Sequence, residues 1–154
     1  MKKLLSYGFA AALVLLTALP ALAKSYDVCL DAGDDAVSGF NFVAVANVYP
    51  GGTISSAAAV TCSTLDASPI GTFFAQGVAV SELPKASSTD SLYVVWHFRI
   101  NGQGAFDTSG PVETTATYPQ TIIGSTNIFL APITGTATVT NLAANAFRVT
   151  VPLL

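Results

Sequence analysis

The chain has 154 residues, of which 51% are hydrophobic and only 10% are charged, and its formal net charge is −3. Six Lys and Arg residues against nine acidic residues cannot neutralise a phosphate backbone, which argues against nucleic acid as a partner. The same excess of acid disfavours adsorption to anionic membranes.

Residues 1–23 are predicted to be a cleaved signal peptide. Two lysines are followed by an apolar run over 4–19, and Pro20 precedes the small-x-small pattern that signal peptidase cleaves after Ala23. We therefore expect one secreted or periplasmic domain over 24–154. Cleavage would leave four basic against nine acidic side chains, a net charge of −5. No later apolar run approaches the about 18 residues of a membrane helix, so we expect no membrane span after cleavage.

Cys29 and Cys62 are the only cysteines, an even number in a chain predicted to reach an oxidising compartment. We expect them to form a structural disulfide. A metal or redox pair is disfavoured because the two residues are far apart in sequence and have no histidine companions.

An acidic, turn-rich segment follows the first cysteine. Asp31, Asp34 and Asp35 flank Gly33, and carboxylates gathered on a loop are ligands that calcium prefers. The spacing is not that of an EF-hand loop, and the bidentate Glu of such a loop is lacking. We therefore interpret the segment as a solvated turn and expect no metal or other cofactor.

Short strands of alternating polarity are predicted along the rest of the chain. The clearest is Leu92–Ile100, which the hairpin signal of Asn101 and Gly102 follows. Gly77 predicts a bulge or a bend in an earlier strand. Such a pattern predicts a single all-β domain, an antiparallel β-barrel or alternatively a β-sandwich. The other expected strands cover 26–30, 40–49, 72–83, 105–108, 112–118, 121–123, 127–130, 135–141 and 147–151, and 54–65 fits a strand or a short helix followed by a strand.

Three motifs of the C-terminal half resemble those of small exported β-barrels of the allene oxide cyclase and dirigent group. Residues 122–129 read IIGSTNIF where that group has I-x-G-G-T-G-x-[YF], with Ser125 and Asn127 in place of glycines. Residues 135–139 read GTATV for G-T-x-T-V, and residues 147–150 read FRVT for F-R-V-x. The resemblance implies an antiparallel barrel with a small lumen, often in an oligomer. It carries over no catalytic residue.

His97 is the only histidine, so any histidine-dependent catalysis must depend on it. Tyr93 and Arg99 share its face of the strand, as polar groups lining a lumen would. Glu82 or Asp90 would be the carboxylate that orients the imidazole. No G-x-S-x-G elbow supplies a nucleophile. We therefore interpret these residues as an outward-facing polar stripe and regard catalysis as the less favoured reading.

A small apolar ligand in the lumen would contact aromatic side chains, although such residues more often simply fill a core. The candidate ligand-binding residues are Phe73, Trp96, Phe98 and Phe106, with Phe74 and Phe129 as further lining.

We expect a non-catalytic β-domain that acts at or outside the cell surface, by binding a cell-surface partner or by self-assembly into a homo-oligomer. One alternative is a barrel-lumen enzyme, cyclase- or isomerase-like, or a carrier for a small apolar ligand. Another is a fimbrial-type subunit with residues 147–154 as a donor strand. An enclosed His97 would favour the enzyme, whereas an outward His97 would remove its only base.

Overall fold

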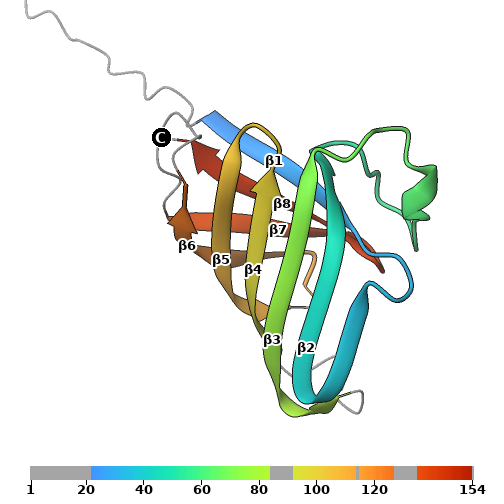
Figure 1. Cartoon of the computed structure of the whole chain (residues 1–154), viewed down its shortest axis with the longest axis vertical. Helices are drawn as coiled ribbons and strands as arrows, with labels where there is room; N and C mark the ends of the chain where they lie inside the picture. Colours follow the sequence, from blue (N-terminus) through green and yellow to red (C-terminus); the bar gives the residue numbers. More distant parts are fainter. Residues whose placement is uncertain (1–21, 84–91, 114, 127–134, 154) are drawn as a thin grey trace, which may run out of the picture.

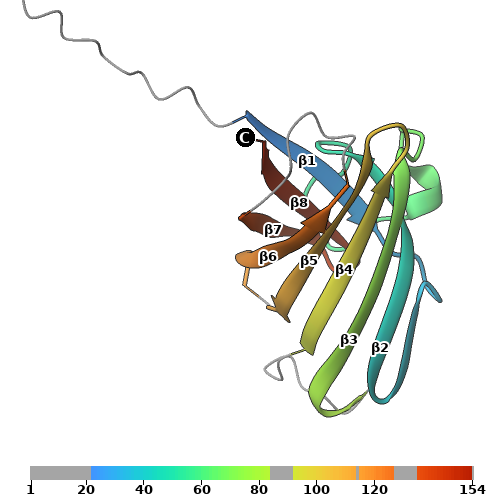
Figure 2. The ribbon, with the colours of Figure 1, turned by 60° about the vertical axis from the view of Figure 1, so that its left-hand side comes forward.

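The computed structural model describes residues 22–83, 92–113, 115–126 and 135–153 of the chain. Eight antiparallel strands form a closed barrel in which each strand pairs with its neighbours in sequence, and β8 closes the ring on β1 (Figure 1). Figure 2 shows β1 and β8 side by side at this closure. The predicted all-β antiparallel barrel is confirmed over the alternative sandwich. The strands are β1 Leu22–Cys29, β2 Asp35–Pro50, β3 Gly71–Leu83, β4 Leu92–Ile100, β5 Gly104–Val112, β6 Thr117–Ser125, β7 Thr136–Ala143 and β8 Ala146–Leu153.

β4 illustrates why these sequences form a barrel wall. Its even-numbered residues from Val94 to Ile100 are buried inside the ring, and the odd-numbered residues between them face outward. Burying each large apolar side chain contributes about 1.5–3 kcal/mol, so the alternation fixes which face of the strand turns inward. The largest residues of this core are Tyr26, Phe73, Trp96, Phe98, Phe106, Tyr118 and Phe147.

Aromatic rings close the barrel near the turn between β4 and β5. Phe98 and Phe106 are opposite each other in register, and their rings stack with centroids 4.5 Å apart. Tyr26 packs against Phe106 at 5.6 Å. This end of the barrel is therefore a packed core.

β2 doubles back on itself. The amide of Val45 donates a hydrogen bond to the carbonyl of Asp34 (2.8 Å), and Figure 1 shows the first part of β2 running down beside the second part. β1 pairs with β2 only from Tyr26 opposite Pro50 to Cys29 opposite Asn47. The first part of β2 therefore lies outside the eight-strand ring, along the edge that β1 leaves free.

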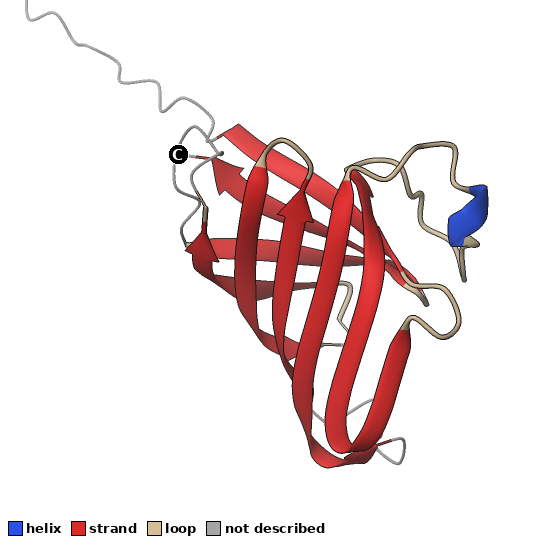
Figure 3. Ribbon diagram, in the orientation of Figure 1, coloured by secondary structure: helices blue, strands red, loops and turns tan. Residues whose placement is uncertain are grey.

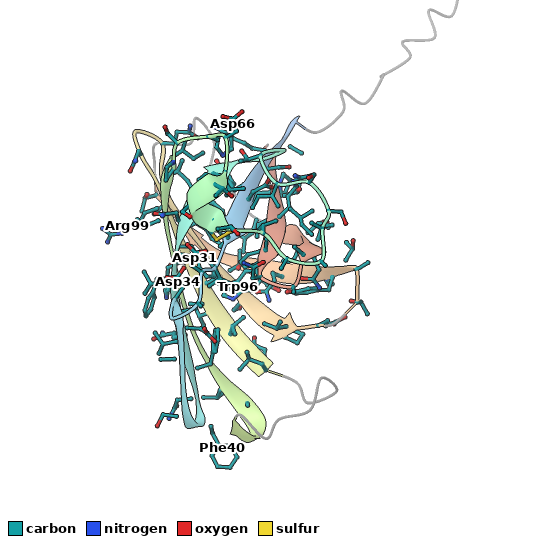
Figure 4. All side chains as sticks on the ribbon, turned by 90° about the vertical axis from the view of Figure 1, so that its right-hand side faces the viewer. Asp31, Asp34, Phe40, Asp66, Trp96 and Arg99 are labelled. Atoms are coloured by element: carbon teal, nitrogen blue, oxygen red, sulfur yellow. A yellow bond between two sulfur atoms is a disulfide. The ribbon has the colours of Figure 1, made fainter. Side chains whose placement is uncertain are left out.

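A loop over residues 51–70 crosses the outside of the barrel, where we expected regular structure over 54–65. It contains one short 3₁₀ helix, η1 Cys62–Thr64 (Figure 3). The predicted disulfide is confirmed, since Cys29 of β1 is bonded to Cys62 (the yellow bond in Figure 4). A second, smaller core lies under the loop and comprises Cys29, Tyr49, Ile54, Cys62 and Ala146.

The continuous strand expected over 112–118 is wrong, because β5 ends at Val112 and β6 is a separate strand. Asn141 gives the physical reason. Its side-chain amide donates hydrogen bonds to the carbonyls of Glu113 and Thr115 (3.1 and 2.8 Å). In a continuous strand these carbonyls would instead accept from the backbone of a neighbouring strand. The strand expected over 127–130 lies outside the described residues.

The strand has no bulge at Gly77, where we expected a bulge or a bend. The register passes through it without a shift toward either β2 or β4. A Cβ atom at this position would lie 2.6 Å from the carbonyl oxygen of Tyr93, so the close approach of two backbones explains the glycine.

Among the described residues, no helix has the length and apolar character needed to cross a membrane.

Candidate functional site

His97 lies on the outer face of β4, paired with an acid on the next strand. His97 and Asp107 are opposite each other in register, with Nδ1 and Oδ1 2.9 Å apart, and their side chains are 36% and 39% exposed. The ring of Phe74 on β3 stacks on the imidazole at 5.7 Å. The three side chains form a row across the outside of β3, β4 and β5. A side-chain hydrogen bond this exposed contributes at most about 1 kcal/mol.

Neither Tyr93 nor Arg99 points into the lumen. Tyr93 is 53% exposed on the same outer face, and Figure 4 shows Arg99 pointing away from the barrel. Glu82 belongs to β3, but its side chain lies outside the part that the structure describes, as does all of Asp90. A lumen enzyme would therefore have to work without the only histidine of the chain.

A cavity of about 190 Å³ lies inside the barrel at the end opposite the stacked Phe98 and Phe106 rings. Its aromatic wall is formed by Phe73, Trp96 and Phe147. The rings of Trp96 and Phe147 stack with centroids 4.7 Å apart, and Phe73 meets Trp96 edge-on at 5.7 Å. Small side chains from β2 and β3, Ala44 and Ala75, leave the space open.

Two of the four predicted ligand-binding residues line this cavity. Phe73 and Trp96 do so, whereas Phe98 and Phe106 fill the packed end of the barrel. Phe74 faces outward on β3, and Phe129 lies outside the described residues.

The acidic segment lies at the mouth of this cavity. A cleft of about 430 Å³ shares Leu30, Phe42 and Asn145 with the cavity and is also lined by Asp31 and Asp35. This placement follows from the course of the chain, because β1 ends here and the first part of β2 begins here. No local sequence signal could have related the aspartates to Trp96, which is more than sixty positions away.

Hydrogen bonds within the acidic segment shape a turn. The amide of Asp31 donates to Asp34 Oδ2 (2.7 Å), and the amide of Asp34 donates to the carbonyl of Asp31 (3.1 Å). Asp31 Oδ1 accepts from the amide of Cys62 (3.2 Å), and Figure 4 shows Asp31 and Asp34 close together. In the described part of the chain, no three His, Cys, Asp or Glu side chains are grouped so as to hold a metal ion.

Tyr118 of β6 is a polar residue in the largely apolar wall of the cavity. It is 3% exposed, and burial raises the pKa of its hydroxyl well above the ordinary value, with the Glu113 carboxylate adding to the shift. The neutral phenol is thus the form present across the physiological pH range.

An exposed apolar surface covers the outside of three neighbouring strands, and we call it the β2–β4 face. Large exposed apolar residues gathered on one surface are typical of interaction sites. A hollow of about 450 Å³ lies on this face between Val43, Val78 and Tyr93. The β2–β4 face is defined by Val43, Val45, Phe74, Val78 and Tyr93, each 38–55% exposed, and by the half-buried Val95.

No protein-family model matches this chain, and a search of curated proteins finds no match either. The resemblance to the allene oxide cyclase and dirigent group stays a prediction. The cavity, its acidic mouth and the β2–β4 face are the features of the described residues that bear on function.

Proposed function

We propose that this chain is an exported, non-catalytic β-barrel that acts by binding, and that its partner is a second copy of itself. The observation that carries the proposal is the β2–β4 face. Single exposed apolar residues are ordinary on protein surfaces, but a group that spans three paired strands and surrounds the polar Gln76 is not. Burying such a face on association removes apolar surface from water, which is the main driving force of protein assembly.

Charge favours a second copy as the occupant of this face. The outward residues of segments 41–47, 72–78 and 93–99 include no acid, and Arg99 at one end is the only Lys or Arg. The whole chain, in contrast, carries more acid than base. Two copies can bring their β2–β4 faces together without the like-charge repulsion that other surfaces would meet.

The shape of the face also suits a two-fold contact. Val45 and Phe74 are opposite each other in register and form an exposed ridge. The hollow lined by Val78 and Tyr93 lies beside this ridge, farther along β3 and β4. In an isologous pair, the ridge of each copy meets the hollow of the other, so one patch supplies both halves of the interface.

Analytical ultracentrifugation of the purified chain over a range of concentrations tests this proposal. We expect a dimer whose dissociation constant rises at least about tenfold in Val78→Asp, because a desolvated charge opposes the contact. The matched control is Ile123→Asp, which places the same charge at a 55% exposed position of β6, outside the face. A protein that stays monomeric at about 1 mM, or a control that weakens the dimer equally, contradicts self-association.

Export is the second part of the proposal. It is supported by the signal-like start of the sequence and by the Cys29–Cys62 bond, since disulfides persist in oxidising compartments. Cleavage after Ala23 would leave Lys24 as the first residue of β1 and would remove only two residues of that strand. Mass spectrometry of the protein recovered from outside the cytoplasm should show a chain that starts at Lys24. Recovery of the full-length chain from the cytoplasm would contradict export.

The lumen enzyme and the fimbrial-type subunit receive less support. The outward position of His97 leaves a lumen enzyme without its candidate base. For a fimbrial-type subunit, residues 147–154 would have to serve as a donor strand, yet β8 is already paired with both β1 and β7. Releasing it would open the barrel.

A further inference from the structure

We propose that the open end of the barrel is a binding site for a small molecule that joins one apolar ring, or a short apolar chain, to an ammonium group. The site is separate from the β2–β4 face and does not depend on self-association. Three features of the described residues carry the proposal: an aromatic cavity, an acidic mouth, and basic side chains that all lie elsewhere.

The size of the cavity sets the size of the apolar group. At about 190 Å³ the cavity is somewhat larger than the cavity of about 150 Å³ that holds benzene in an engineered protein. A single ring or a chain of similar volume therefore fits inside the cavity, and a fused multi-ring ligand would extend beyond it. The rings of Phe73, Trp96 and Phe147 supply the surface against which the apolar group packs.

The acidic mouth of the cavity favours a positive charge on the polar end of the ligand. Asp31 and Asp35 line the cleft that continues outward from the cavity. Asp31 uses Oδ1 to accept from the amide of Cys62, and neither aspartate takes part in a salt bridge within the described residues. A cation held in this cleft would be the counter-ion of both carboxylates.

The basic side chains of the described residues lie away from the cavity and its mouth. Arg148 pairs with Asp27, Lys24 donates a hydrogen bond to Gln103, and Arg99 lies on the outer face of β4. No Lys or Arg among the described residues lines the cavity or the cleft. A carboxylate ligand would meet only negative charge here, whereas an ammonium group meets two acids and nearby aromatic faces that also attract cations.

Three probes with the same ring test the proposal: 2-phenylethylamine, the neutral 2-phenylethanol and the anionic 3-phenylpropionate. Trp96 is the only tryptophan of the chain and lines the cavity, so its fluorescence reports occupancy directly. We expect saturable binding of the amine at least about tenfold tighter than that of the carboxylate at low ionic strength. The affinity for the alcohol should lie between the affinities for the amine and the carboxylate. The preference should shrink at about 0.5 M salt, where the screening length is only a few ångströms.

Variants separate the roles of the cavity and its mouth. Asp31→Asn with Asp35→Asn should abolish the preference for the amine and leave binding of the alcohol unchanged. The matched control is Asp66→Asn with Asp107→Asn, which removes the same charge from positions outside the cleft. This control variant should keep most of the preference for the amine over the carboxylate.

Filling the cavity tests whether the ring binds inside. Ala75→Leu on β3 and Ala44→Leu on β2 each place a larger side chain in the cavity, from a different strand. Either substitution should lower the affinity for all three probes at least about tenfold. The wild-type comparison needs no variant and decides the proposal alone. A carboxylate bound as tightly as the amine would overturn it, as would no saturable change in Trp96 fluorescence with any probe at about 10 mM.

Discussion

Asp27 and Arg148 lie directly opposite each other on β1 and β8 and form a two-pronged ion pair on the outside of the barrel. Arg148 Nε lies 2.7 Å from Asp27 Oδ1, and Nη2 lies 3.0 Å from Oδ2. The loop over 51–70 covers the pair, so Asp27 is 0% exposed and also accepts hydrogen bonds from the amides of Gly52 and Ile54. The hydrogen bond to Asp27 raises the pKa of Arg148 and outweighs the opposing effect of burial.

Asp27→Asn should strongly destabilise the fold. The substitution leaves the Arg148 guanidinium partly buried without its counter-charge, and breaking a buried pair in this way costs about 3–5 kcal/mol. Urea unfolding measures the loss. The control is Asp107→Asn, which breaks the exposed pair with His97 and should cost less than about 1 kcal/mol. Equal losses in the two variants would show that the loop does not shield the pair.

Reduction of the Cys29–Cys62 bond should lower the free energy of unfolding by about 3–4 kcal/mol, because the bond closes a long loop in the unfolded chain. Urea unfolding with and without a reductant measures the difference. The double variant Cys29→Ala with Cys62→Ala should be as unstable as the reduced protein and should not respond to the reductant. If the oxidised and reduced proteins unfolded at the same urea concentration, the bond would have no stabilising role.

The barrel should lose stability in alkaline solution. Burial raises the pKa of Tyr26 from 10.0 to about 12 and that of Tyr118 further. The folded protein then keeps protons that the unfolded chain releases, so stability falls as the pH rises above 10. Each tyrosine contributes up to about 1.4 kcal/mol per pH unit between its unfolded and folded pKa values.

Urea unfolding between about pH 8 and pH 11.5 measures this slope. Tyr26→Phe should flatten it, because the variant has lost one of the two phenols whose pKa burial raises. Tyr93→Phe is the control, since Tyr93 is 53% exposed on the outer face. A slope that responds equally to both substitutions would contradict the assignment to buried hydroxyls.

Gly71→Ala should destabilise the start of β3. A Cβ atom there would lie 2.1 Å from the carbonyl oxygen of Arg99, a backbone atom that cannot move without disturbing the ladder with β4. Overpacking of this kind costs about 1–3 kcal/mol or more, as a thermal melt would show. At Gly124 the nearest atom to an added Cβ, Asp107 Oδ2, is 3.7 Å away, so Gly124→Ala should change stability by at most about 0.5 kcal/mol.

Local pattern was sufficient to predict some elements. The alternation of Leu92–Ile100 gave both the bounds of β4 and its inward face, because only one register buries Trp96 and Phe98. The disulfide followed from there being only two cysteines in a chain for which export was predicted.

Other features depend on contacts that no local pattern encodes. Asp27 looks like a surface residue in the sequence, and the partner that allows its burial, Arg148, is 121 positions away. The same limit applies to the open end of the barrel. Asp35 reaches the mouth of the cavity that Trp96 lines because β1 ends and β2 begins there. The Ser38-Gly39 dipeptide is a turn signal, but it does not say which strand the chain meets after the reversal.

The closure of the ring brings the two ends of the strand series together, since Leu22 at the start of β1 is opposite Leu153 at the end of β8. A short linker could therefore join these ends. New termini could then open at the exposed turn of Asn101 and Gly102, away from the cavity and its acidic mouth. Each strand would keep both of its neighbours in such a circular permutant. The closed ring therefore does not require the chain to start at β1. A chain that starts at β5 and ends at β4 could form the same eight strand pairs.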